Sequence, residues 1–259
     1  RGSGRGPGPA GLGNRPASPG EARPRRGLGH GHARQEVGDG RADQQGVEDR
    51  AHVGEAAERD GFTWSVHRPN AVVGFAVGAL MNQGLTLACY ASICRETGRP
   101  FLFTGIREQW EMLTEVSDAR LIARQAAWAA TTPAARNQAF NTGNGDVFRW
   151  KRIWKVIADH FGIEVAPYDG KHQSLEAMMG DAGTIWRAMA EKYGLAEPDI
   201  SRLATWWHTD ADFGRKVECI SDMTRSRKAG FLDYQCYTDT FLDLFRRLED
   251  ERIIPRFDK

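Results

Sequence analysis

From Phe62 onward, short apolar runs alternate with longer amphipathic stretches. Residues 63–68 (TWSVHR) are rich in β-favouring side chains and end at Pro69, which lacks an amide donor, so they predict a strand. Further short strands are predicted at residues 101–104 and 139–141. Strands that alternate with helices along the chain are typical of an α/β fold.

Helices are predicted where apolar residues recur at helical spacing. One begins after Asp118, whose carboxylate can accept from the first amides of a helix. Several of the other predicted helices are followed by glycine, a residue that commonly ends helices. Gly180 and Gly183 are weak points within the predicted helix at 175–193. The other predicted ranges are 79–97, 150–161, 175–193, 213–229 and 238–251.

The first 60 residues have a different composition from the rest. They contain no aromatic residue, Ile, Met, Cys or Lys, and abundant Gly, Arg, Ala and Pro. A segment with so few apolar side chains cannot offset its ordering entropy, so residues 1–61 are predicted to be disordered and of low complexity. Because Gly, Arg, Ala and Pro have GC-rich codons and Arg1 stands where Met is expected, a second interpretation is an out-of-frame translation, with the true frame resuming between Gly54 and Phe62.

Charge and composition narrow the classes of partner. The formal net charge is +1, and the early arginines are interleaved with acids and lack aromatics for base stacking, so no nucleic-acid partner is expected. No apolar run is long enough to span a membrane and no signal peptide is recognisable, so a cytoplasmic protein without a membrane partner is predicted. The cysteines lack paired spacing, and no His, Cys, Asp or Glu group has metal-ligand spacing.

Several short motifs stand in a characteristic order. They are TWSVHRP at 63–69, NTGNGDVFRWK at 141–151, WW at 206–207, FG at 213–214, the stretch from Ser221 to Gly230-Phe231, and RIIP at 252–255. Together they resemble the extended short-chain dehydrogenases/reductases, specifically the progesterone 5β-reductase and iridoid synthase-like (PRISE) family. The resemblance runs from about Phe62 to Pro255, with Asn70 where the family often has Gly.

The resemblance implies a fold and a reaction. Residues 62–259 would be the C-terminal part of a Rossmann-type α/β fold with a mostly helical substrate lobe. The family reaction is NADPH-dependent 1,4-reduction of a small-molecule enone or enal. By position, the cofactor contacts would be Val73, Leu80, Met81 and Asn82, although Val73, Leu80 and Met81 could equally be core residues. His208 would face the substrate pocket, the alternative being a partly exposed surface histidine.

The catalytic groups that the family implies have no counterpart here. The catalytic Tyr would fall near Gly46, but the first Tyr in the chain is Tyr90 and the first Lys is Lys151. No glycine-rich phosphate loop is recognised after an apolar strand. No catalytic residue is therefore assigned, and the chain as it stands is expected to be inactive.

Three functions compete. The first is an NAD(P)H-dependent enone reductase whose N-terminal half is corrupted or missing in this sequence. The second is a non-catalytic binding or decoy subunit, with a homodimer as one form, because an incomplete sheet leaves an unpaired edge. The third is a sugar-nucleotide epimerase or dehydratase of the same superfamily, which Trp206-Trp207 and the Ile-Ile-Pro ending disfavour.

Overall fold

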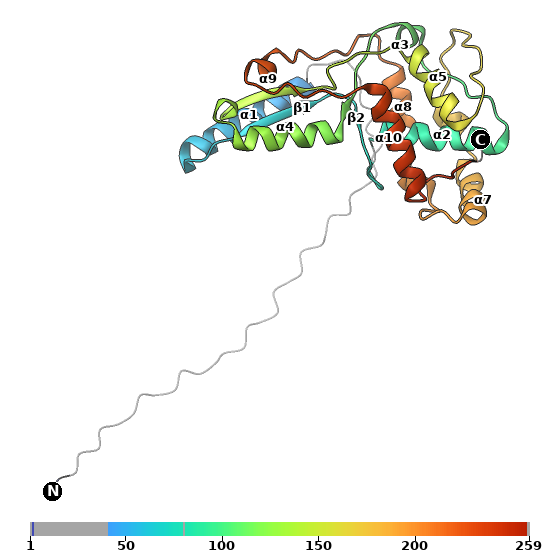
Figure 1. The fold of residues 1–259 in the computed structure, drawn as a ribbon, viewed down its shortest axis with the longest axis horizontal. Coiled ribbons are helices and arrows are strands. Elements are labelled where there is room, and N and C mark those ends of the chain that lie inside the picture. Colours follow the sequence, from blue (N-terminus) through green and yellow to red (C-terminus); the bar gives the residue numbers. More distant parts are fainter. Residues whose placement is uncertain (1, 3–40, 80, 258–259) are drawn as a thin grey trace. The chain divides into compact units, whose positions relative to one another are not determined.

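The computed structural model describes residue 2 and residues 41–79 and 81–257, with only the backbone described within 41–50. The chain divides into a unit of residues 1–36 and a unit of residues 37–259, and the fold is that of the second unit (Figure 1). Its strands are β1 (Ser65–Pro69), β2 (Val72–Val73), β3 (Ser117–Asp118) and β4 (Gln138–Thr142). Its helices are α1 (Arg41–Asp60), α2 (Gln83–Thr97), α3 (Arg107–Glu111), α4 (Ala119–Thr131), α5 (Trp150–Phe161), α6 (Leu175–Met178), α7 (Ala182–Tyr193), α8 (Trp206–Phe213), α9 (Thr224–Lys228) and α10 (Tyr237–Asp250), with single 3₁₀ turns at Pro133–Ala135 and Ile200–Arg202.

The described strands form two parallel pairs. β1 pairs with β4 in continuous register from Ser65 opposite Gln138 to Pro69 opposite Thr142. β2 pairs with β3 in the same sense. Helix α4 packs against both β1 and β4 (Figure 1). Parallel strands separated by helices make this an α/β fold, as predicted.

A helical lobe surrounds α2. Every residue from Gln83 to Cys94 is buried, as expected for a helix that is covered on all sides. Helices α5, α7, α8 and α10 pack around it (Figure 1). The rings of Phe101 and Trp154 stack at 4.4 Å between centroids, and Phe103 lies 4.7 Å from Phe213. The lobe therefore has one continuous aromatic and aliphatic core.

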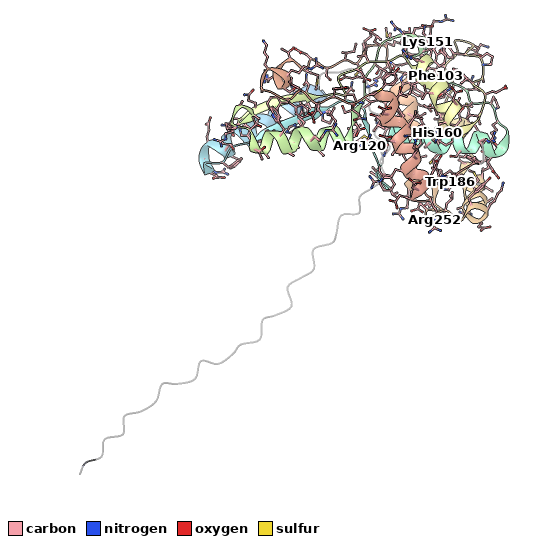
Figure 2. The ribbon with its side chains drawn as sticks, in the orientation of Figure 1. Phe103, Arg120, Lys151, His160, Trp186 and Arg252 are labelled. Carbon is pink, nitrogen blue, oxygen red and sulfur yellow. The ribbon has the colours of Figure 1, made fainter. Side chains whose placement is uncertain are left out.

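A buried polar network joins the strands to α10. Asp118 caps α4 by accepting from the Arg120 backbone N–H at 2.8 Å, and its carboxylate also binds the Arg120 guanidinium at 2.7 Å. Asn144 accepts from the Asp118 N–H at 2.7 Å and donates to Thr240 Oγ1 at 2.9 Å. Thr240 donates to Asp118 Oδ2 at 3.0 Å. The guanidinium of Arg120, which is labelled in Figure 2, also binds Asp243, which like Thr240 belongs to α10.

The N-terminal prediction needs correction. Residues Arg41–Asp60 form α1, so the disorder predicted for 1–61 is wrong for this stretch, while residues 3–40 lie outside the described residues. The stretch contains no proline and many Ala, Glu, Gln and Arg residues, which favour helix. Val53 and Ala57, one turn apart, supply its less exposed positions.

Other helix and strand boundaries also differ from those predicted from the local sequence pattern. Of the predicted helix 213–229, Phe213 is the last residue of α8 and Thr224–Lys228 form α9, while residues 214–222 are irregular. The predicted strand at 101–104 is reduced to an isolated bridge between Phe101 and Val165. The predicted helix 175–193 is divided into α6 and α7 around Gly180, which confirms the weak point.

Replacing Asp118 by Ala should lower the free energy of unfolding by roughly 2–4 kcal/mol, because the cap is lost and Arg120 and Thr240 lose a buried partner. Although burial alone would raise it, hydrogen bonds from Arg120 hold the pKa of Asp118 below its ordinary value. The stabilisation is therefore present above the unfolded-state pKa and is lost as pH falls through the lower folded-state pKa. Urea unfolding across pH tests this.

Asp243→Ala is the matched control. Asp243 binds the same guanidinium, but 38% of its side chain is exposed, so its loss should cost less than about 1 kcal/mol. Equal losses from the two variants would contradict a dominant role for Asp118.

Candidate active site

The carboxyl ends of β1 and β4 meet at one edge, where ligands bind in open α/β sheets. Asn70 follows β1 directly, and its backbone N–H donates to Ser117 Oγ at 3.1 Å. Ser117 in turn donates to the Thr142 carbonyl at 2.6 Å. These bonds hold the ends of β1, β3 and β4 together.

The irregular segment after α8 passes across this edge. The Asn70 side chain donates to the Cys219 carbonyl and accepts from the Cys219 thiol, both at 3.4 Å. The Ser221 N–H donates to Glu115 Oε1 at 3.0 Å. Residues 219–221 therefore form one wall of the candidate site. In the sequence, Asn70 stands out only as a departure from Gly, and Glu115 carries no signal, because a glutamate usually faces solvent.

One glycine-rich turn lies between a strand and a helix, at residues 143–146 between β4 and α5. A side chain at Gly143 would come within 2.8 Å of Glu115 Oε2, so this glycine accommodates a carboxylate. Burial raises the pKa of Glu115, and Asp146, in the same turn, raises it further. A pyrophosphate would meet two carboxylates here, so the turn does not have the character of a phosphate loop.

Two of the predicted cofactor residues come together. Asn82 is the N-cap of α2: its Oδ1 accepts from the Leu85 N–H at 3.2 Å and its Nδ2 donates to the Gly74 carbonyl at 2.8 Å. Val73 is completely buried, so its side chain is a core group and only its backbone could meet a ligand. Met81 is 67% exposed, and Leu80 lies outside the described residues. Asn82 thus fixes the turn at Val73–Gly74 against α2.

His208 lies in the first turn of α8. That helix is attached to α2 by the Thr205 N–H, which donates to Thr86 Oγ1 at 3.1 Å. His208 Nδ1 is 3.6 Å from Asp212 Oδ2, and neither atom has a hydrogen-bond partner in the structure. Burial raises the pKa of Asp212, whereas Arg215 and His208 act to lower it. The side chain of His208 is 21% exposed, and its place in a substrate pocket stays a prediction.

The pockets only partly coincide with the predicted site. A pocket of about 280 Å³ lies beside Val73, Gly74 and Phe75, with the Arg247 guanidinium 4.1 Å above the Phe75 ring. A larger pocket of about 580 Å³ lies between α5 and α10, around the 2.8 Å hydrogen bond of His160 with Glu249. No predicted site residue lines the larger pocket. The smaller one fits a ligand at the turn after β2 better.

Tyr90 and Lys151, the first tyrosine and the first lysine of the chain, both lie away from the strand ends. Tyr90 is fully buried in α2 and its hydroxyl donates to the Leu102 carbonyl at 3.2 Å. Lys151 lies at the surface and binds Glu111 at 2.5 Å (Figure 2). Within residues 41–79 and 81–257, no group of three or more His, Cys, Asp or Glu residues could hold a metal ion. In the same part of the chain, no helix is long and apolar enough to cross a membrane.

Parallel strands, an intervening helix and a crevice at the strand ends define a Rossmann-type α/β protein. The chain belongs to the PRISE-like Rossmann-fold domain family, whose model matches residues 49–255. The match begins before Gly54, so any out-of-frame segment would end before the range from Gly54 to Phe62 that composition indicates. The resemblance to the PRISE family is thereby confirmed.

Curated relatives agree with this assignment. The chain is 37% identical over 201 residues to the (S)-8-oxocitronellyl enol synthase of Antirrhinum majus, covering 77% of this chain and 52% of the relative. It is 40% identical over 195 residues to the 3-oxo-Delta(4,5)-steroid 5-beta-reductase of Arabidopsis thaliana, covering 74% of this chain and 50% of that protein. The chain thus spans about half the length of the curated relatives it matches.

Solved structures show the same fold at low identity. The terminal R domain of the myxalamid PKS-NRPS pathway matches with a TM-score of 0.51 at 15% identity, over 80% of this chain and 48% of that chain. The UDP-N-acetylglucosamine 4-epimerase of Methanobrevibacter ruminantium M1 matches with a TM-score of 0.50 at 13% identity, over 81% of this chain and 52% of that chain. At such identities, the likeness concerns the fold alone.

Asn82→Ala should lower the free energy of unfolding by about 1–3 kcal/mol, since both the helix cap and the bond to Gly74 are lost. Asn82→Asp separates the two roles, because it keeps the cap but places a carboxylate oxygen against the Gly74 carbonyl. We expect Asp to be intermediate in urea unfolding. An aspartate variant as stable as the native chain would show that the Gly74 contact contributes nothing.

Glu115→Gln should reduce the pH dependence of stability. Burial raises the folded-state pKa of Glu115 above its unfolded value, so its contribution is fully present below the unfolded-state pKa and is lost as pH rises through the folded one. Relative to the native chain, the variant should gain stability as pH rises through that window. Thermal unfolding at a series of pH values measures it, and a difference that stays constant with pH would contradict the prediction.

Proposed function

We propose that this chain contributes the substrate lobe and two pairs of parallel strands to an NADPH-dependent reductase of carbon–carbon double bonds conjugated to a carbonyl. The identity of 37–40% to enol synthases and a steroid 5-beta-reductase carries the proposal. The turn fixed by Asn82 and the edge at Asn70 support it, because both lie beyond the carboxyl ends of parallel strands.

The residues present fit one side of a nicotinamide site. When bound, the cofactor would supply a hydride to the β-carbon of the enone or enal. The backbone of Val73–Gly74 would face the ring, and Asn82 would hold that turn in place while it keeps one amide hydrogen for a ligand. The smaller pocket, with Phe75 below Arg247, offers an aromatic and cationic wall.

The electrons that enter the double bond accumulate on the carbonyl oxygen, where the enolate needs a hydrogen-bond or proton donor. Tyr90 and Lys151 are held elsewhere, and Asn70 is bound to Cys219. Tyr234 lies beside Gly145 in the turn after β4, but it is 75% exposed, so it is not held against the strand ends to supply this donor. The donor would therefore come from the portion of the relatives that this chain does not match.

A chimera tests the proposal. The matched half of the Arabidopsis relative is replaced by residues 49–259, and NADPH oxidation is followed with 2-cyclohexenone and citral as probes. We expect NADPH-dependent loss of the enone absorbance by the chimera and none by the 259-residue chain alone. The Asn82→Ala chimera should turn over at least about tenfold more slowly, since the turn at Val73–Gly74 is no longer fixed.

Two results would overturn the proposal. One is a folded chimera that binds NADPH and reduces no enone or enal. The other is turnover by the isolated chain, because it would show that the groups already present suffice.

A non-catalytic binding subunit is the second candidate. In the part of the chain that the structure describes, β1 pairs with β4 alone, and this favours the second candidate because an unpaired strand edge can receive another polypeptide. A sugar-nucleotide epimerase or dehydratase has only the likeness of fold in its favour, at 13% identity to the epimerase from Methanobrevibacter. Enone reduction therefore remains the preferred activity.

A further inference from the structure

The larger pocket, between α5 and α10, is lined by groups that the proposed reductase site does not use. Its volume of about 580 Å³ lies within the usual range for small-molecule sites in proteins. Leu242, Arg246 and Glu249 of α10 line one side of it, at spacings that place them on a single face of that helix. The C-terminal half of α5 and the pair Arg256-Phe257 line the rest.

The pocket has a preformed polar centre. His160 Nε2 lies 2.8 Å from Glu249 Oε1, and the two side chains are only 12% and 14% exposed. The His160 ring also lies against Phe161 and Phe245, at 5.0 Å and 5.3 Å between ring centroids. Because an ionised carboxylate only accepts hydrogen bonds, Nε2 carries the hydrogen of this pair. Both groups are therefore fixed before any ligand arrives.

Apolar side chains form the walls. Val156 of α5 and Leu242 of α10 are partly buried and pack against the main core. Phe257 is held in place by the Tyr193 ring, 5.7 Å away between centroids, and by the Arg95 guanidinium, 6.0 Å from its centroid. These walls suit a ligand with an apolar body.

Two arginines line the same pocket with hydrogen-bonding capacity to spare. Arg246 Nη1 donates to Asp243 at 2.9 Å, and 59% of its side chain is exposed. Arg256 binds Asp250, and its Nε lies 3.6 Å from Glu249 Oε2. A guanidinium has five N–H donors. Within the described residues, neither arginine uses all of its donors.

The carboxylates of the lining, by contrast, already have cationic or N–H partners. Glu249 binds His160 through one oxygen and lies beside Arg256 with the other. Asp159 accepts from Lys155 at 2.9 Å. The unused capacity of the pocket is therefore mainly that of N–H donors, which favours a ligand that accepts hydrogen bonds and carries negative charge.

We propose that this pocket is a second small-molecule site, which takes an organic carboxylate with an apolar body. Arg246 and Arg256 supply donors to the carboxylate, a group that the planar guanidinium can bind through two parallel hydrogen bonds. Val156, Leu242 and Phe257 receive the apolar body. The site shares no lining residue with the smaller pocket beside Val73–Gly74, so it does not rest on the proposed reductase function.

Asp243 joins the two pockets. Its Oδ1 accepts from Arg246 at 2.9 Å, and its Oδ2 accepts from Arg120 at 3.0 Å. Arg120 and Asp243 both line the smaller pocket. Asp243 thus competes with a bound carboxylate for Arg246, and a ligand that wins this competition loosens the contact of Asp243 with the α10 side of the larger pocket.

Calorimetric titration of the 259-residue chain with octanoate tests the site. Octanamide has the same apolar body without the charge, and acetate has the charge without the body. We expect saturable one-to-one binding of octanoate and at least about tenfold weaker binding of the other two, because each lacks one half of the interaction.

Three variants locate the binding. Arg246→Gln should weaken octanoate binding at least about fivefold, because charged donors are lost. Asp243→Ala should strengthen it about threefold, because the competing carboxylate is gone. Arg124→Gln is the matched control: Arg124 pairs with Asp233 at the surface, away from the pocket, and its loss should leave the affinity unchanged. Unfolding transitions check that each variant is folded.

An absence of saturable octanoate binding would overturn the inference and leave the arginines as partners of the helix ends. Equal affinity for octanamide would also overturn it, as would unchanged affinity in both Arg246→Gln and Arg256→Gln. The chimera should bind octanoate as the chain does, and loss of binding there would show that the rest of the fold covers the pocket. An inactive chimera that still binds octanoate counts only against the proposed reaction.

Discussion

The buried carboxylate of Asp118 is the point on which the arrangement of strands and lobe depends. It is 2% exposed, yet it caps α4, binds Arg120 and accepts from Thr240 of α10. Asn144, two residues after β4, completes this hydrogen-bond network. Because charge is costly to bury, such a network holds only when every member is paired, and it then fixes a single geometry. This network, together with the bond from Ser117 Oγ to the Thr142 carbonyl, fixes the relative position of the two short sheets.

The parts of the fold that local pattern determines were predictable. Asp118 caps α4, and Gly98, Gly162 and Gly194 end α2, α5 and α7 in the left-handed conformation that glycine favours. Residues 214–222 were not predictable, because their apolar spacing suits a helix while long-range contacts hold them extended. Those contacts, from Asn70, Gln109 and Glu115, come from residues distant in sequence. Composition also misjudged Arg41–Asp60, where helix propensity outweighs the scarcity of large apolar side chains.

The candidate site, like the fold, could be predicted from the sequence only in part. Position within the family motif put Val73 and Asn82 forward as cofactor contacts, and Asn82 donates to the carbonyl of Gly74, the residue after Val73. The resemblance could not show that Val73 would be sealed in the core or that Asn82 would be occupied as a cap. Glu115 carried no signal in the sequence, since its burial results from the approach of Gly143 and Ser221. Contacts of this kind exist only once the chain is folded.

The helical lobe and the strand region differ in the size of their buried cores. The lobe around α2 and α10 has a continuous core that contains Trp154, Trp186 and Phe213, whereas the cluster beneath β1 and β4 contains three buried residues. Burial of apolar area is the main favourable term in folding, so the lobe should resist opening more than the strands do. The candidate site lies where these regions of unequal stability meet. Its strand side, with Asn70, should therefore open more readily than the side formed by α2.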